Sequence, residues 1–169
     1  SYFNDITGRG YAAPLAWMYN RTLLGRVLGR ADRIVVLREA FPFRALEPYK
    51  DKVRVIPPGV DMQVFSPKKT DRVADIFFLS VLDRFHHYKG LDILLDAVEM
   101  VRTEFPAIRL VIGGSGSGAA DCRTRVQAMG LDRNVTFAGF IPDADLPRWY
   151  AGSRMFVLAS TDPALEGFG

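Results

Sequence analysis

The chain has 169 residues, of which 49% are hydrophobic and 24% charged, with a formal net charge of +3. This composition is typical of a soluble globular protein with one full core or slightly more, and the scattered lysines and arginines do not indicate a nucleic-acid partner. The single cysteine, Cys122, excludes an internal disulfide and a cysteine-based metal cage, and it is interpreted as a small buried hydrophobe on a helix.

No apolar run reaches the roughly 18 residues of a membrane span, and the N-terminal residues lack the pattern of a signal peptide. The sequence therefore predicts a cytoplasmic protein. The chain begins without an initiator methionine and stops just after a predicted strand, so we expect it to be a fragment of a longer protein.

A helix is predicted from Pro14 onward. Apolar side chains at Leu15, Met18, Tyr19, Leu23, Val27 and Leu28 share one face, and Arg21, Arg26 and Arg30 lie on the other. One interpretation is that the apolar face packs against its own domain while the arginines are solvated. The other is that the helix lies on an anionic membrane surface, which predicts peripheral contact with the inner membrane face.

The next elements are short. Residues 34–37 form an apolar run that predicts a buried strand, residues 39–49 a helix interrupted by two prolines, and residues 53–56 a strand. Pro57-Pro58-Gly59 then breaks regular structure, and residues 66–75 have the composition of a linker. We therefore predict three parts: residues 1–56 as the end of one domain, 57–75 as a hinge, and 76–169 as a second domain.

In the second part, strands and helices alternate regularly. Strands are predicted at residues 76–82, 109–112, 135–138 and 155–159, and helices at 90–104, 119–129 and 145–151. This order indicates right-handed βαβ units and an α/β fold: a Rossmann-like parallel sheet with helices on both faces. Gly130 suits the left-handed cap that ends the second of these helices.

The loop after the first of these strands is the first candidate site. It carries His86, His87 and Lys89 beside a helix N-terminus, where an anion is favoured. Adjacent histidines point apart on an extended chain, so we expect a phosphate or hydroxyl contact from one of them rather than a metal site. Lys89 is the stronger anion ligand, and a solvated loop lysine is the alternative.

A glycine-rich turn, Gly113-Gly114-Ser115-Gly116-Ser117-Gly118, joins the next strand to its helix. Glycines there let backbone amides approach a phosphate, and Gly114, Gly116 and Ala119 match the G-x-G-x-x-A dinucleotide pattern. A nicotinamide or flavin site would also need an acid after the following strand, and residues 135–140 contain none. A nucleotide of another kind is favoured over a flexible turn, and a dinucleotide oxidoreductase is not supported.

Glu166 follows the last predicted strand in a loop of small residues. A carboxylate flanked by glycines at a strand end can point into the cleft, but a surface glutamate fits the same pattern. The residues alone do not favour either interpretation.

Taken together, these segments resemble the GT-B glycosyltransferases of family 4. The resemblance covers most of the chain from Ala31 onward. It is carried by Val53-Arg54-Val55-Ile56-Pro57-Pro58-Gly59-Val60-Asp61, Lys89-Gly90-Leu91-Asp92, Gly114-Ser115-Gly116, residues 135–141, and Ser160 leading to Glu166-Gly167-Phe168-Gly169. It implies two Rossmann-like domains facing a cleft, a nucleotide-diphosphate sugar as donor, no metal or other cofactor, and retention of anomeric configuration.

The resemblance also implies roles for individual residues. Lys89 would contact the donor diphosphate, Gly114, Ser115 and Gly116 would approach the nucleotide, and Phe140 and Ile141 would border the base. Glu166 would lie near the donor sugar, with the amides of Gly167, Phe168 and Gly169 on sugar hydroxyls and phosphate. The acceptor would be a saccharide or a lipid-linked saccharide.

The chain departs from this family at Ser80-Val81 and at Pro58, which replaces the usual asparagine. The family pairs its diphosphate lysine with an arginine in a Gly-Arg dipeptide, and Ser80-Val81 stands there, which leaves Arg84 as the nearest substitute. A second glutamate would lie beyond Gly169, so the fragment alone is expected to be inactive. The alternative function is a nucleotide-binding α/β module without transferase activity.

Overall fold

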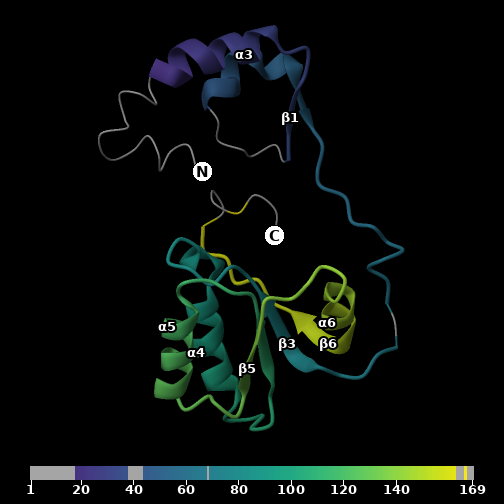
Figure 1. The fold of residues 1–169 in the computed structure, drawn as a ribbon, viewed down its shortest axis with the longest axis vertical. Helices are drawn as coiled ribbons and strands as arrows, with labels where there is room; N and C mark the ends of the chain where they lie inside the picture. Colours follow the sequence, from purple (N-terminus) through teal and green to yellow (C-terminus); the bar gives the residue numbers. More distant parts are fainter. Residues whose placement is uncertain (1–17, 38–43, 68, 163–165, 167–169) are drawn as a thin grey trace. The chain divides into compact units, whose positions relative to one another are not determined.

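The computed structural model describes residues 18–37, 44–67, 69–162 and 166, in two compact units. Unit 1 comprises residues 1–59 and 163–169, and unit 2 comprises residues 60–162 (Figure 1). The division after Gly59 falls inside the predicted hinge, and the predicted limits of the three parts stay predictions.

Unit 1 consists of a helical layer and a two-stranded sheet. A π-helical turn, η1 (Asn20–Leu24), continues into α3 (Gly25–Arg30), and β1 (Ile34–Val36) pairs in parallel with β2 (Val53–Val55). Between β1 and β2 in the sequence lies η2 (Arg44–Lys52), a 3-10 helix with a kink at Tyr49. The Tyr49 hydroxyl donates to the Gly25 carbonyl at 3.0 Å and Lys52 Nζ to the Gly29 carbonyl at 2.7 Å, so η2 is fixed to α3.

In unit 1 the prediction of a buried strand is wrong, and both interpretations of the apolar helix face stay open. Val35, in the strand predicted to be buried, is 57% exposed, and Met18, Leu23 and Val27, on the predicted apolar helix face, are all exposed. Among the described residues, unit 1 has one small sheet and one helical layer. Each layer can cover only one face of the other layer, and the opposite face stays exposed. The helix itself is present from Met18 to Arg30, and its predicted start at Pro14 lies outside the described residues.

Unit 2 contains a four-stranded parallel sheet in the order β5-β4-β3-β6. Its elements in chain order are β3 (Ala74–Leu79), the 3-10 turn η3 (His87–Lys89), α4 (Leu91–Val101), β4 (Leu110–Gly113), α5 (Ala119–Ala128), β5 (Val135–Gly139), α6 (Leu146–Gly152) and β6 (Ser153–Phe156). The α/β fold with a parallel sheet is therefore confirmed, and Gly130 has the predicted left-handed conformation, with φ of 62°.

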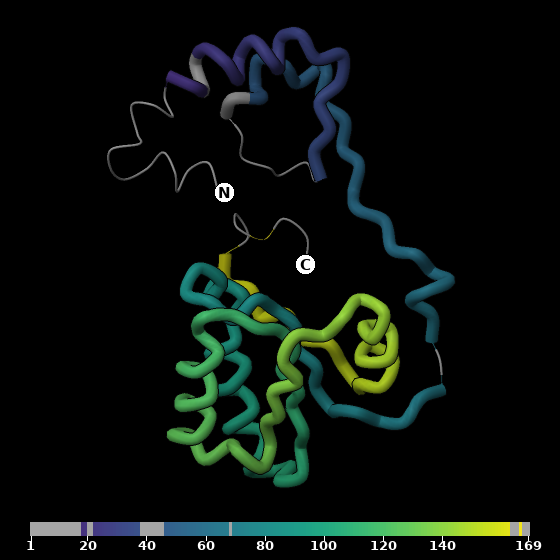
Figure 2. The backbone as a smooth tube through the Cα atoms, in the orientation of Figure 1, coloured from purple at the N-terminus to yellow at the C-terminus, as the bar shows by residue number. Residues whose placement is uncertain are grey.

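Alternate residues of the central strands point to opposite faces and form two cores. Ile76 and Phe78 pack with α4 and α5, whereas Phe77 packs with α6, where its ring stacks on Trp149 at 5.8 Å. Figure 2 shows the coils of α4 and α5 side by side on one side of the sheet and that of α6 on the other. Helices cover both faces of the sheet, as predicted. A site is therefore expected at the ends of the strands.

The strand order reverses at β3. From β3 the chain passes through α4 to β4 on one side, and β6 returns later to the other side of β3. In open α/β sheets, ligands bind outside the carboxyl ends of the strands at such a reversal. The carboxyl ends of β3 and β6 are therefore the edge at which to look for a site in unit 2.

Candidate functional site

The loop after β3 and the segment after β6 are bound to each other at this edge. The backbone amide of Thr161 donates to the Tyr88 carbonyl at 2.7 Å, and the Thr161 hydroxyl donates to the same oxygen at 3.2 Å. Gly90 has φ of 74°, and a Cβ atom there would overlap the Ala159 carbonyl. Gly90 is therefore required by the close approach of two segments of the backbone, and it brings the Lys89 turn against the segment after β6.

The glycine-rich turn packs on the loop after β3. A Cβ atom at Gly114, where φ is 116°, would overlap the Ser80 carbonyl, and one at Gly116 would overlap the Leu82 carbonyl. The Leu82 amide donates to the Ser115 carbonyl at 3.0 Å, and the Gly118 amide donates back to the Leu82 carbonyl at 2.8 Å. These bonds continue the pairing of β3 and β4 past the strand ends, so the glycines serve backbone packing whatever else they bind.

Residues 80–82, predicted as the end of a strand, form this paired loop instead, because β3 ends at Leu79. The sequence shows the apolar character of the segment but not the turn that follows it.

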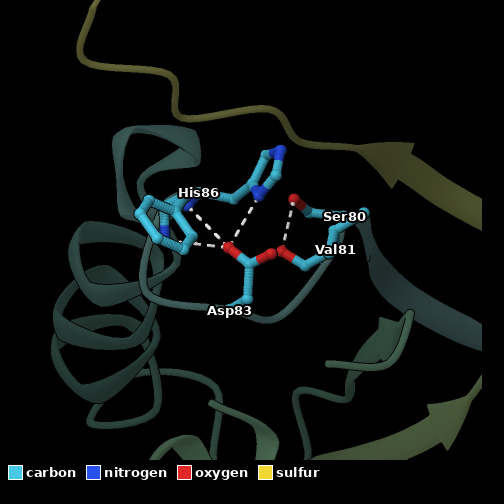
Figure 3. A network of polar contacts seen from close by, with 5 residues as sticks. Ser80, Val81, Asp83 and His86 are labelled. Carbon is cyan, nitrogen blue, oxygen red and sulfur yellow. Dashed lines mark hydrogen bonds and ion pairs between the residues drawn. The ribbon is translucent and has the colours of Figure 1, made fainter. Parts of the chain in front are cut away.

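Asp83 organises that turn, as Figure 3 shows. Its Oδ1 atom accepts hydrogen bonds from the Phe85 amide at 2.8 Å, the His86 amide at 3.0 Å and His86 Nδ1 at 2.7 Å. The hydrogen bond from His86 lowers the pKa of the Asp83 carboxyl, with the two backbone bonds acting in the same direction. Sequence reasoning missed Asp83, although an Asp at the start of a turn, where it accepts bonds from amides two and three residues on, is a known signal.

A cavity of about 300 Å³ lies between this loop and the first turns of α4 and α5. Its basic lining residues are Arg84, His86, His87, Lys89 and Arg125, and its acidic ones Asp83, Asp92 and Asp121. Lys89 Nζ lies 5.3 Å from the centre of the Tyr88 ring. The structure thus brings two predicted donor-site residues, Arg84 and Lys89, to the lining of one cavity at the carboxyl end of β3.

Cys122 also lines this cavity, and burial raises the pKa of its thiol. A thiol with a raised pKa carries less thiolate at neutral pH, which agrees with the predicted role as a small packing residue.

Phe140 and Ile141, predicted to border a base, lie in different environments. Phe140 is 74% exposed and follows Gly139, whose carbonyl accepts a bond from the Gly114 amide at 2.7 Å. Ile141 is 7% exposed and packs in the core beside Gly113. The structure therefore places Phe140 next to the glycine-rich turn, while the Ile141 side chain supports that turn from the core.

The remaining predicted residues do not belong to the described part of unit 2. Glu166 is partly buried and belongs to unit 1. Gly167, Phe168 and Gly169 lie outside the described residues. Their assigned roles stay predictions.

Two further properties of the described residues bear on partners. Over residues 18–37, 44–67, 69–162 and 166, no group of three or more His, Cys, Asp or Glu side chains could hold a metal ion. Within the same part of the chain, no helix combines the length and the apolar character needed to cross a membrane.

The doubly wound sheet, with its loops meeting at the reversal of strand order, defines a Rossmann-like α/β domain. Solved structures share this fold: a pneumococcal O-GlcNAc transferase, GtfA, in complex with UDP and GlcNAc has a TM-score of 0.67 at 20% identity, over 88% of this chain and 29% of that one. HepE from Anabaena, in complex with UDP and glucose, has a TM-score of 0.67 at 19% identity, over 90% of this chain and 44% of that one.

Residues 63–169 match the family described as Glycosyl transferases group 1, and the chain belongs to this family. D-rhamnosyltransferase WbpZ of Pseudomonas aeruginosa is 36% identical over 134 residues, which are 74% of this chain and 33% of the relative. O-antigen chain mannosyltransferase C of Escherichia coli is 42% identical over 108 residues, 60% of this chain and 27% of the relative. The chain thus spans about a third of the length of the curated relatives that it matches.

Proposed function

We propose that the protein carrying this chain is a retaining glycosyltransferase of family 4, which moves a sugar from a nucleotide-diphosphate sugar to a saccharide or lipid-linked acceptor, and that unit 2 belongs to its donor-binding side. The observation that carries the proposal is the meeting of the Lys89 turn, the glycine-rich turn and the segment after β6 at the carboxyl ends of β3 and β4. Membership of the glycosyltransferase family supports the reaction class.

The chemistry of sugar transfer gives these residues a reason. As the bond between the sugar and the diphosphate breaks, negative charge grows on the leaving group and positive charge on the sugar ring. In the proposed mechanism Lys89 and backbone amides of the glycine-rich turn stabilise the diphosphate, and the Glu166 carboxylate stabilises the sugar. No metal ion takes part in the proposed step.

The relatives support the choice of substrates. Two of them are named for rhamnosyl and mannosyl transfer, the second in an O-antigen chain, and the two solved structures of the same fold hold UDP and a sugar. We therefore infer a nucleoside diphosphate sugar as donor and a role in polysaccharide or glycolipid synthesis. The proposed location is the cytoplasm, with peripheral contact of the exposed helix face of Met18, Leu23 and Val27 at the inner membrane face.

The test is sugar transfer by the full-length protein from a panel of UDP- and GDP-sugars, with the product's anomeric configuration read by NMR. Lys89→Ala should weaken binding of the donor by about 10- to 100-fold, the range for one charge-assisted contact. Glu166→Ala should lower the transfer rate by roughly 100-fold or more, because a stabilising charge is lost at the reacting centre. Lys50→Ala and Glu104→Ala, at exposed positions on η2 and after α4, serve as controls.

The alternative, a nucleotide-binding module without transferase activity, is favoured by one feature, Val81 at the place of the family's arginine. It predicts that UDP or GDP binds and that no donor of the panel is consumed. Transfer that is unchanged by Glu166→Ala would remove this glutamate from the mechanism, and an inverted product would overturn the retaining assignment.

A further inference from the structure

His86 is held in place by two contacts within the loop after β3. Its Nδ1 atom lies 2.7 Å from Asp83 Oδ1, and its ring packs on Tyr88 with 5.8 Å between ring centres. The side chain is 24% exposed. His87, the next residue, is exposed and lies in the first turn of η3. The sequence offered the two histidines as equal candidates for a phosphate contact, and this packing distinguishes between them.

The His86 ring also lies at the edge where the strand order reverses. Its neighbour Tyr88 is bound through its carbonyl to Thr161, on the segment after β6. In Figure 3 the imidazole stands between Asp83 and that segment, with its second nitrogen pointing away from Asp83. Lys89 Nζ lies 5.3 Å from the same Tyr88 ring that packs on His86. Two basic groups are therefore held around one aromatic ring at the predicted anion site.

Hydrogen bonding fixes what the second nitrogen can do. With Nδ1 donating to the Asp83 carboxylate, a protonated imidazole carries its other N–H on Nε2, where it can donate to a phosphate oxygen. The carboxylate holds the ring in one orientation, so little conformational entropy is lost when an anion binds. Arg84, in contrast, is exposed on the same turn and has a long, rotamer-rich side chain to order.

We propose that His86, oriented by Asp83, contacts the diphosphate of the donor in place of the arginine that the family carries at the position of Val81. The inference rests on the proposed function, because it assigns one ligand within the same donor site. His86 binds substrate in this scheme, and Asp83 is a positioning residue that acts through it.

The segment after β6 carries an unpaired polar group beside the Tyr88–Gly90 turn. The Ser160 hydroxyl is buried and has no hydrogen-bond partner among the described residues. Ser160 lies between Ala159 and Thr161, the two residues that touch the Tyr88–Gly90 turn. Buried hydroxyls are normally hydrogen-bonded, so the unpaired Ser160 hydroxyl is an exception that lies next to this turn.

The decisive comparison uses two replacements of His86 in the full-length protein. His86→Asn keeps an amide N–H near the position of Nδ1, and thus the bond to Asp83, but has no group at Nε2. His86→Arg restores a cation that can reach a phosphate. His87→Asn compares the neighbouring histidine, and Lys50→Ala, at an exposed position on η2, is the control. Calorimetry measures binding of UDP, GDP, inorganic pyrophosphate and the nucleosides uridine and guanosine.

We expect His86→Asn to weaken binding of pyrophosphate and of the preferred nucleoside diphosphate by about 10- to 100-fold, the loss typical of one charge-assisted hydrogen bond. Binding of the corresponding nucleoside should stay unchanged, because it lacks the diphosphate. His86→Arg should recover most of the loss, His87→Asn should lose clearly less affinity than His86→Asn, and Lys50→Ala should bind as the wild type does.

Each other outcome overturns the proposal in a recognisable way. Wild-type affinity for diphosphates in His86→Asn would show that the ring only anchors the loop. An equal loss for the nucleoside would show that the substitution disturbs the whole site. If the wild type transfers sugar and one of these two results is found for His86→Asn, only the role of His86 is refuted. If the wild type binds no diphosphate, the proposed function is refuted as well.

Discussion

Replacing Gly114 with alanine tests how the glycine-rich turn is held. Gly114 has φ of 116°, and its Cα faces the Ser80 carbonyl so closely that a methyl group cannot fit. The obstacle is backbone rather than a flexible side chain, so the turn and the loop after β3 must move apart. That movement breaks the bonds from the Ser80 amide to Gly113 and from the Leu82 amide to Ser115, of 3.2 and 3.0 Å.

The expected cost has two parts. An alanine at positive φ is strained by about 1–3 kcal/mol, and two backbone hydrogen bonds contribute roughly 0.5–1.5 kcal/mol each. Gly114→Ala should therefore lower the stability of unit 2 by about 2–6 kcal/mol, a large share of the 5–15 kcal/mol typical of a domain. Gly139 has φ of 72° with open space around it, so Gly139→Ala is the control that carries only the strain.

Hydrogen exchange read by mass spectrometry measures both variants in the same unit. Peptides from β3 and β4 should show the larger loss of protection in Gly114→Ala, by about 1–3 kcal/mol relative to Gly139→Ala, while peptides from β1 and β2 keep their wild-type exchange. Equal losses in the two variants would refute the reasoning, because contact with the Ser80 carbonyl would then contribute nothing.

Two further predictions concern the same edge. Gly90→Ala should separate the Lys89 turn from Ala159 and weaken binding of the preferred nucleoside diphosphate, in calorimetry, by roughly 10-fold or more; wild-type affinity would show that this junction does not shape the site. The pKa of Asp83 is lowered in the folded state, so the ionised carboxylate stabilises the fold. This stabilisation is complete above the ordinary carboxyl pKa of about 4 and is lost as the pH falls through the lowered pKa of the folded state. In urea unfolding, the difference in stability between wild type and Asp83→Asn should shrink below roughly pH 4, and a difference that is constant with pH would contradict this.

The fold of unit 2 could be predicted from the sequence because its signals are local. Apolar runs such as Ile76–Leu79 and helical spacing such as Leu91, Leu94, Leu95 and Val98 fix the element types, and alternation of the two fixes a parallel sheet. Those residues are buried in the structure with the exception of Leu79, which is partly buried. The predicted element ends deviate from the observed ones by up to three residues, since hydrogen bonding rather than composition decides them.

In unit 1, local sequence signals do not predict which residues are buried. The run Ile34-Val35-Val36-Leu37 has the composition of a strand covered on both faces, yet Val35 and Leu37 are exposed. Composition reports which residues favour burial, but burial itself depends on what other elements lie against them. The Asp83 turn was missed for a related reason. Its three hydrogen bonds are local, but they orient a candidate site residue only because the turn lies where the strand order reverses.

The glycines of the Gly113–Gly118 turn sharpen this point. As a sequence motif they suggest close approach of a phosphate, and yet the structure requires Gly114 and Gly116 for the approach of another stretch of backbone. Their presence alone therefore does not argue for a nucleotide. Tertiary structure supports an anion site instead, because this turn, the Lys89 turn and the segment after β6 meet where the strand order reverses. A protein that kept the glycines but lost the bond between Tyr88 and Thr161 would retain the motif and lose the site.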